Sequence, residues 1–199
     1  FSHWPDADSS HEETLEAYDT LIRAGKVRTV GASNYSAIMM REAQQTAIVK
    51  SLQRYEVTQP RYNLYDRAEF DALQPYLVEN EVGSIVYYSL ASGFLTGKYR
   101  SQDDLGQSAR GSGAGQYLNA KGLSILGALD QVAAELDATP AEVALAWLVA
   151  QPGVSAPIVG ATKIEQLEDA ISATELQLDA RTVKSLEAPY KPRAPMGHT

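Results

Sequence analysis

Four short runs of β-branched and aromatic residues in this 199-residue chain are each followed by small or amide-bearing side chains. In chain order these are Ser33 and Asn34, then Gln59, then Tyr87 to Gly93, and finally Gly160 to Lys163. Amide and hydroxyl groups can hold a carboxamide through matched donors and acceptors. A tyrosine face can stack on a flat heterocycle, and small residues before a helix let backbone N–H groups approach a phosphate. Together these groups describe a site for a nicotinamide dinucleotide, although any one such amide is more often a loop-bonding residue.

The intervening segments predict the elements that must position these side chains. Strands are expected over 27–32, 55–59, 84–88 and 155–159. Helices are expected from Ser10 to the residue before Gly25, from Ser36 through at least Ala43, over 69–80, 121–136, 139–150 and 163–173, and near Asp179. Ser10 with Glu13, and Thr139 with Glu142, have the spacing of capping boxes at helix starts. Strands that alternate with amphipathic helices indicate a parallel α/β sheet.

Four parallel strands do not close a barrel, and an eight-stranded (β/α) barrel needs about 250 residues. The chain is therefore predicted to be a single domain over 1–199 that supplies roughly the second half of a TIM barrel. Such a half would expose two unpaired strand edges and an apolar face, which favours oligomers or aggregation. The alternative is an open doubly wound sheet, but its Gly-x-Gly-x-x-Gly turn after a first strand is missing. Gly111 to Gly115 stand inside an expected loop instead.

Two stretches lack a regular pattern. Residues 101–115 are rich in Gly, Ser and Gln, with Leu105 as the one large apolar side chain, and we expect a long mobile loop. Residues 189–199 are expected to form a C-terminal tail. Both would shape substrate specificity, and neither carries readable chemistry.

Composition excludes several classes of function. A net charge of −8 argues against nucleic acid or an anionic membrane as partner, and no apolar run approaches the roughly 20 residues that span a bilayer. Zero cysteines exclude a disulfide or a thiolate nucleophile. Since no His and carboxylate spacing supplies three ligands, we expect no metal. The first residues are unlike a signal peptide and lack an initiating Met, so a cytoplasmic protein cut at its front is expected.

Five blocks of sequence resemble the aldo-keto reductase family, and they span nearly the whole chain. They are His3-Trp4-Pro5-Asp6, residues 30–36 (VGASNYS), residues 59–64 (QPRYNL), residues 87–99 (YYSLASGFLTGKY), and residues 157–163 (PIVGATK) with Gln166-Leu167-Glu168. Their order and spacing identify the chain as similar to the C-terminal portion of a bacterial-type, NADP-dependent member.

The resemblance implies a role for each matching residue. His3 would be the histidine of the family's Asp-Tyr-Lys-His tetrad, while Ser33, Asn34 and Gln59 would hold the nicotinamide carboxamide. Aligned on the Leu-Ala-Ser-Gly string, the stacking tyrosine falls on Tyr87. The remaining cofactor contacts would come from Tyr88, Ser89, Leu90, Gly93, Leu95, Lys98, Gly160, Thr162, Lys163 and Gln166. A 2′-phosphate calls for a cation, which Lys163 supplies, although an Arg that many relatives have nearby is absent from this block.

The implied activity is reduction of an aldehyde or ketone to an alcohol with NADP(H). The Asp, Tyr and Lys of the tetrad precede the histidine in the family, and no residue of this chain is assigned to them. Tyr62 could lie near a substrate, but the match gives it no role as an acid. Two alternatives stay open: an NADP-binding regulatory subunit with little catalysis, such as a channel β-subunit, and an inert fragment.

Overall fold

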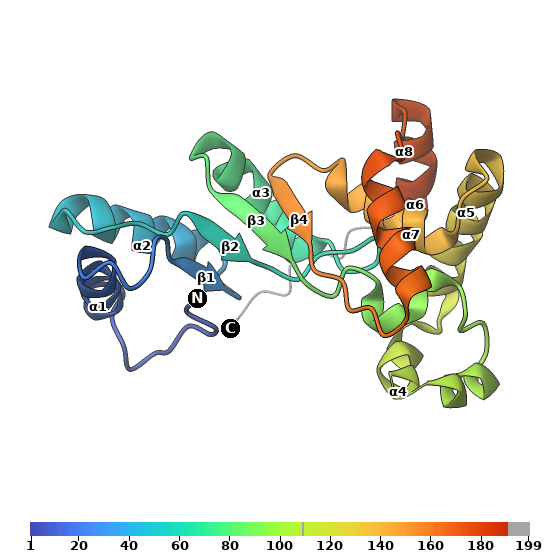
Figure 1. The fold of residues 1–199 in the computed structure, drawn as a ribbon, viewed down its shortest axis with the longest axis horizontal. Coiled ribbons are helices and arrows are strands. Elements are labelled where there is room, and N and C mark those ends of the chain that lie inside the picture. Colours follow the sequence, from blue (N-terminus) through green and yellow to red (C-terminus); the bar gives the residue numbers. More distant parts are fainter. Residues whose placement is uncertain (109, 191–199) are drawn as a thin grey trace.

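A four-stranded parallel sheet forms the centre of the molecule (Figure 1). The computed structural model describes residues 1–108 and 110–190. The strands are β1 (Gly31–Ser33), β2 (Val57–Gln59), β3 (Gly83–Val86) and β4 (Val154–Pro157), and they lie side by side in chain order, β1-β2-β3-β4. A doubly wound sheet reverses its strand order at a switch point, and this order has no reversal. The arrangement is that of consecutive strands of a (β/α) barrel.

Each strand is shorter than the sequence predicts, because only part of each β-rich run lies in the ladder. The strand expected over 27–32 pairs at Gly31–Ser33 alone, with Ala32 opposite Thr58. Gly31 allows the close approach of β2: a Cβ atom on Gly31 would stand 2.5 Å from the carbonyl oxygen of Val57. The sheet continues beyond its named strands through single parallel bridges between Ser2 and Ala32 and between Arg61 and Tyr87.

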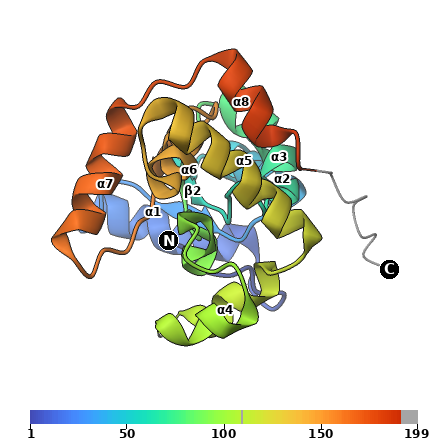
Figure 2. The ribbon, with the colours of Figure 1, turned by 90° about the vertical axis from the view of Figure 1, so that its right-hand side faces the viewer.

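The helices follow the strands as the sequence predicts. They are α1 (His11–Arg23), α2 (Ala37–Lys50), α3 (Ala68–Glu79), α5 (Ala120–Leu136), α6 (Pro140–Val149), α7 (Ile164–Glu175) and α8 (Ala180–Glu187). The expected capping boxes form at Ser10 and Thr139, whose hydroxyls accept from the backbone N–H groups of Glu13 and Glu142. α1 and α2 pack together at the β1 end of the sheet, while α5 to α8 gather at the other end (Figures 1 and 2).

Large aromatic side chains fill the core. Tyr62, Phe70 and Trp147 are fully buried, and the Tyr62 ring centroid lies 4.2 Å from that of Phe70 and 5.2 Å from that of Trp147. Burial of such rings removes a large apolar area from water and dominates core energetics. The core thus joins α3 to α6 around the strand ends.

The segment expected to be a loop over 101–115 contains short helical turns. They are the 3₁₀ turn η2 (Gln102–Gln107), the single turn α4 (Gly111–Ala114) and the beginning of the 3₁₀ turn η3 (Gly115–Tyr117). α4 packs against η1 (Ala91–Thr96), the 3₁₀ segment that follows β3. Its first residue must be glycine, because a Cβ atom on Gly111 would stand 1.8 Å from the carbonyl oxygen of Leu105. The tail predicted over 189–199 lies outside the described residues beyond Tyr190.

Among the described residues, no helix is long and apolar enough to cross a membrane.

Candidate functional site

His3 reaches the C-terminal edge of the sheet because the chain before it runs parallel to β1. The N–H of Ser2 donates to the carbonyl of Gly31 at 2.9 Å, and the N–H of Ser33 donates to the carbonyl of Ser2 at 2.7 Å. The backbone of His3 is then tied to the strand end, since Nδ2 of Asn34 donates to its carbonyl oxygen at 2.7 Å. The exposed imidazole therefore lies beside the residues that end β1.

Asn34 organises this edge of the sheet. Its φ of 61° is in the left-handed region, where asparagine is among the few tolerated side chains. Its amide nitrogen donates to His3 and to Oγ of Ser33 (3.1 Å), and its amide oxygen accepts from the Tyr87 hydroxyl at 2.7 Å. Both amide donors are thus used, and one acceptor position is left for a ligand.

These groups surround one cavity of about 500 Å³. Its lining residues are His3, Trp4, Ser33, Asn34, Gln59, Arg61, Tyr87 and Tyr88. Ser33 donates its hydroxyl to the backbone carbonyl of Gln59 at 2.7 Å. The side-chain amide of Gln59 makes no hydrogen bond within residues 1–108 and 110–190, so it offers the cavity both a donor and an acceptor.

Two tyrosines form the aromatic wall of the cavity. The rings of Tyr87 and Tyr88 meet edge to face, with centroids 5.6 Å apart. Tyr88 has a φ of 59°, so the chain turns sharply and brings both neighbouring rings to the same region. Partial burial raises the pKa of the Tyr87 phenol, which stays a neutral donor to Asn34.

Three predicted cofactor contacts after β3 have side chains that serve the fold. The Ser89 hydroxyl is buried and donates to the carbonyl oxygens of Val86 (3.2 Å) and Ile158 (2.8 Å). Leu95 is fully buried, and Leu90 packs against the core. A ligand could meet Ser89 and Leu95 through their backbone only.

Gly93 and Lys98 lie together beyond the cavity. Gly93 has a φ of 85°, and a Cβ atom there would stand 3.5 Å from Nζ of Lys98. The Lys98 ammonium lies 4.9 Å from the centre of the Tyr99 ring. A glycine backbone beside a lysine ammonium is an arrangement that suits a phosphate.

The loop after β4 and the first turn of α7 hold the last four predicted residues, which are exposed and lie outside the cavity. The Gln166 Oε1 atom accepts from the backbone N–H of Thr162 at 2.8 Å and from that of Lys163 at 3.3 Å. Gly160 precedes them in the same exposed loop. Since α7 starts at Ile164, this loop stands at a helix N-terminus, where anions are favoured.

Three residues of this region are not predicted from the sequence as site residues. Arg61 and Trp4 line the cavity, and the Arg110 guanidinium lies beside Gly160, where a Cβ atom would stand 3.0 Å from Nη2. The period of two along a strand places Arg61 on the same face as Gln59, a signal available in the sequence. Arg110 belongs to the segment 101–115, and only the fold brings it to Gly160.

The position of Tyr62 differs from the expectation that it could lie near a substrate. It is not among the cavity-lining residues, because the next residue along an extended chain points to the opposite face. Its hydroxyl donates to Asp71 at 3.3 Å, and burial strongly raises the pKa of its phenol. Tyr62 is a core residue.

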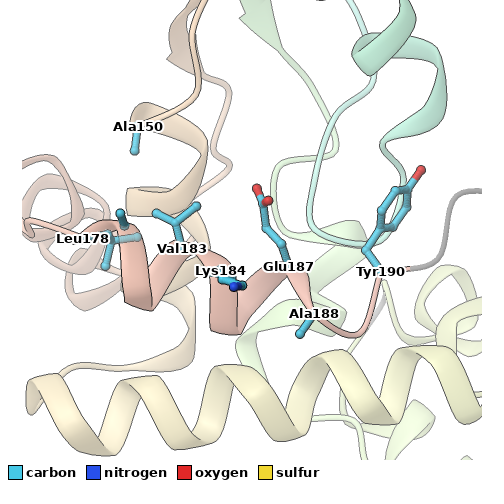
Figure 3. Close-up of a pocket in the computed structure, with 8 residues that line it drawn as sticks. Ala150, Leu178, Val183, Lys184, Glu187, Ala188 and Tyr190 are labelled. Carbon is cyan, nitrogen blue, oxygen red and sulfur yellow. The ribbon is translucent and has the colours of Figure 1, made fainter.

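A second cavity of about 660 Å³ runs along α8 and holds none of the predicted site residues (Figure 3). Its carboxylate, Glu187, is engaged by the fold: Oε1 accepts from the Trp147 indole at 3.1 Å and lies 3.3 Å from Nη1 of Arg67. This cavity therefore offers no free reactive group from Glu187, and the site is the cavity at the strand ends.

Comparison with known proteins agrees with this geometry. Residues 1–191 match the Aldo/keto reductase family. Two Schizosaccharomyces pombe proteins are each 34% identical: one provisionally named an aryl-alcohol dehydrogenase (96% of this chain, 54% of that protein) and one provisionally named a voltage-gated potassium channel subunit beta (87% and 53%). The crystal structure of a thermostable aldo-keto reductase, Tm1743, solved with the inhibitor epalrestat, superposes with a TM-score of 0.73 at 28% identity, covering 94% of this chain and 58% of that one. The chain spans about half the length of the relatives it matches, and it belongs to the aldo/keto reductase family.

Proposed function

We propose that this protein is part of an NADP(H)-dependent oxidoreductase that reduces aldehydes or ketones to alcohols. One observation carries the proposal: a single cavity at the C-terminal ends of parallel strands is lined by His3, Gln59, Tyr87 and the hydroxyl and amide of Ser33 and Asn34. In (β/α) barrels this edge is where catalytic sites form. Family membership supports the oxidoreductase class.

The residues present fit a nicotinamide. A primary carboxamide has two N–H donors and one carbonyl acceptor, so it needs acceptors for its nitrogen and a donor for its oxygen. The unengaged side-chain amide of Gln59 supplies both kinds of group. Asn34 retains an acceptor position on Oδ1, and the Ser33 hydroxyl lies 3.1 Å from its nitrogen. The Tyr87 ring would stack on the pyridine ring, held in place by its bond to Asn34.

The cations nearby favour NADP(H) over NAD(H). The exposed Lys163 stands at the N-terminus of α7, and Arg110 lies against Gly160 of the same loop. A 2′-phosphate requires such cations, because it carries charge that a ribose hydroxyl lacks. Gly93 and Lys98 would face the pyrophosphate, with backbone contacts from Tyr88 to Leu90 and from Leu95. Thr162 and Gln166 would complete the adenosine end.

When bound, the nicotinamide supplies the hydride that reduces the carbonyl carbon. The residues of this chain would bind the cofactor and the substrate and orient one against the other. His3 lines the cavity, and its imidazole makes no hydrogen bond to the described part of the chain. The imidazole can therefore donate a hydrogen bond to the carbonyl oxygen of a substrate. A positioned donor stabilises negative charge as it develops on that oxygen. Trp4, which is 64% exposed, covers one side of the cavity.

We further propose that β1 to β4 correspond to the second half of a (β/α)8 barrel. The Asp, Tyr and Lys that accompany the histidine in the family precede it there. Proton donation is thus assigned to none of the residues of this chain.

The test is NADPH consumption with a simple aromatic aldehyde, run beside NADH, together with equilibrium binding of each cofactor. We expect NADPH to bind at least about 10-fold more tightly than NADH, because of charge-assisted contacts to the 2′-phosphate. Gln59→Leu should weaken the binding of both cofactors, whereas Gln45→Leu, at an exposed position of α2, should change neither affinity. Equal affinity for the two cofactors would remove the NADP assignment.

A second candidate is a cofactor-binding regulatory subunit, favoured by the 34% identity to a protein provisionally named as a channel β subunit. It predicts NADPH binding of normal affinity with no consumption of aldehyde by a chain that carries the family's Asp, Tyr and Lys. Turnover by such a chain would exclude it.

A further inference from the structure

Arg61 is the permanent cation of the cavity, and its position follows from the strand. Residues two apart on a strand share a face, so Arg61 follows Gln59 one step further toward the open edge of the sheet. Its bridge to Tyr87 sets the register: the Tyr62 N–H donates to the Tyr87 carbonyl at 3.2 Å, and the Tyr87 N–H donates to the Pro60 carbonyl at 3.0 Å. If Gln59 holds the carboxamide, Arg61 lies where the part of the substrate remote from the reacting carbonyl must lie.

The guanidinium is held rigidly on three sides. Its Nε donates to Oδ2 of Asp66 at 3.0 Å, and its Nη2 contacts Asp66 at 2.9 Å and the Tyr117 hydroxyl at 2.5 Å. Its plane lies over the Tyr88 ring, with Cζ 4.5 Å from the ring centre. Asp66 is itself fixed by donors from Tyr117 (2.9 Å) and Asn63 (3.2 Å). A cation fixed in this way loses little conformational entropy when it binds a ligand.

One edge of the Arg61 guanidinium has no hydrogen-bond partner in the described part of the chain. Of its three nitrogens, Nε and Nη2 are engaged, and within the described chain Nη1 makes no hydrogen bond. The cavity lining includes no carboxylate among the described residues, and Asp66, the ion-pair partner of Arg61, is not one of the lining residues. The Arg61 side chain is 32% exposed and lines the cavity, so a ligand there can reach it.

We propose that Arg61 is a specificity-determining residue that selects aldehydes or ketones carrying a carboxylate, through charge-assisted hydrogen bonds from Nη1. The aromatic rings of Tyr88 and Trp4 would pack against a flat substrate body, and Arg61 would hold its acidic end. The substrate class is thus an aromatic or short-chain carbonyl compound with a carboxylate remote from the reacting carbon. This inference rests on the proposed function for the orientation of the substrate, but the carboxylate site itself does not.

Binding tests the inference without any need for turnover. Benzoate and acetophenone have nearly the same shape and differ in charge, and acetophenone lacks the carboxamide that Gln59 is proposed to hold. Trp4 in the cavity wall reports occupancy by its fluorescence. We expect benzoate to bind roughly 10-fold more tightly than acetophenone, as one charge-assisted contact permits. In Arg61→Met the preference should vanish through loss of benzoate affinity, while acetophenone binding changes less than about 2-fold. Arg61→Lys should retain part of the preference, because a point charge replaces the planar fork.

Arg100→Met is the matched control. It removes the same charge from an Arg that pairs with Asp130 outside the cavity, through bonds of 2.7 Å from Nη1 and Nη2, and it should leave the benzoate preference unchanged. A wild-type protein that binds acetophenone as tightly as benzoate overturns the inference, as does an Arg61→Met variant that keeps the preference with a wild-type melting temperature.

NADPH binding, measured separately, keeps the two proposals apart. Benzoate preference without NADPH binding would leave the carboxylate site standing and remove the reductase assignment. NADPH binding without benzoate preference would leave the reductase assignment standing and remove the carboxylate site.

Discussion

Arg110 and Gly160 are neighbours in the fold although they are far apart in the sequence: a Cβ atom on Gly160 would stand 3.0 Å from Nη2 and 3.3 Å from Nη1 of Arg110. The contact joins the segment that follows β3 to the loop that follows β4. It supplies a guanidinium beside the block of residues 157–163, where the sequence shows only Lys163 as a cation.

Arg110→Met should weaken NADPH binding while leaving NADH binding nearly unchanged. The reason is that a cation beside the 2′-phosphate adds one charge-assisted contact, worth roughly 10-fold in affinity. Calorimetric titration of both cofactors into wild type and variant gives the ratio directly. Arg100→Met serves as the control for a change in net charge. An equal loss for both cofactors would show that Arg110 contacts a shared part of the molecule or acts through the fold.

Two substitutions of Tyr87 separate its hydrogen bond to Asn34 from the proposed stacking of its ring on the nicotinamide. Tyr87→Phe keeps the ring and loses one hydrogen bond, so NADPH affinity should fall by only about 3-fold. Tyr87→Ala also loses the ring face, and its affinity should fall by at least roughly 10-fold. NADPH fluorescence enhancement measures both. If the two variants lose the same affinity, the ring does not stack on the cofactor.

Gly111 is expected to be indispensable to the segment that carries Arg110. Gly111→Ala would drive a Cβ atom into the Leu105 carbonyl, whereas Gly106→Ala meets nothing within 4 Å. Because the first change requires backbone movement, we expect about 1–3 kcal/mol of destabilisation and faster tryptic cleavage at Arg100 and Arg110. The second should cost about 0.5 kcal/mol or less. Comparable cleavage rates would contradict the packing described for this segment.

Buried tyrosines should set the alkaline limit of stability. Burial is the main cause that raises the pKa of Tyr55, Tyr62 and Tyr117 well above the ordinary value of 10.0. A raised pKa means that the folded state keeps a proton that the unfolded state releases. Stability from this source is therefore complete below pH 10.0 and falls as the pH rises toward the folded values.

An alkaline titration that follows tyrosinate absorbance and circular dichroism together tests this link between phenol ionisation and unfolding. We expect the last phenols to ionise together with the loss of helical signal. Tyr62→Phe keeps the ring contacts with Phe70 and Trp147, so its alkaline transition should move to higher pH by a few tenths of a unit. Ionisation of all phenols before any unfolding would contradict the burial of these side chains.

The sequence by itself determined the order of elements and most of the candidate site. Alternation of period two and period 3.6 is a local property, so the helices and the sheet type could be predicted, and the helix start at Ser10 agrees with the structure. The resemblance to the family, carried by residues such as His3 and Gln59, is confirmed by the family match. Six predicted residues line one cavity, because parallel strands all end at the same edge: His3, Ser33, Asn34, Gln59, Tyr87 and Tyr88.

Tertiary structure alone decided the rest. Strand lengths depend on which residues pair with a partner strand, and of the run predicted over 27–32 only Gly31 and Ala32 pair with β2, with Val30 adding one hydrogen bond from Glu56. The side chains of Ser89 and Leu95 match the family string yet face the interior, since packing and not motif sets which way a side chain points. The neighbours Arg61 with Tyr117 and Arg110 with Gly160 arise from chain segments that no local pattern relates. Such contacts depend on the path of the whole backbone, and a sequence pattern that spans one helix or strand carries no record of that path.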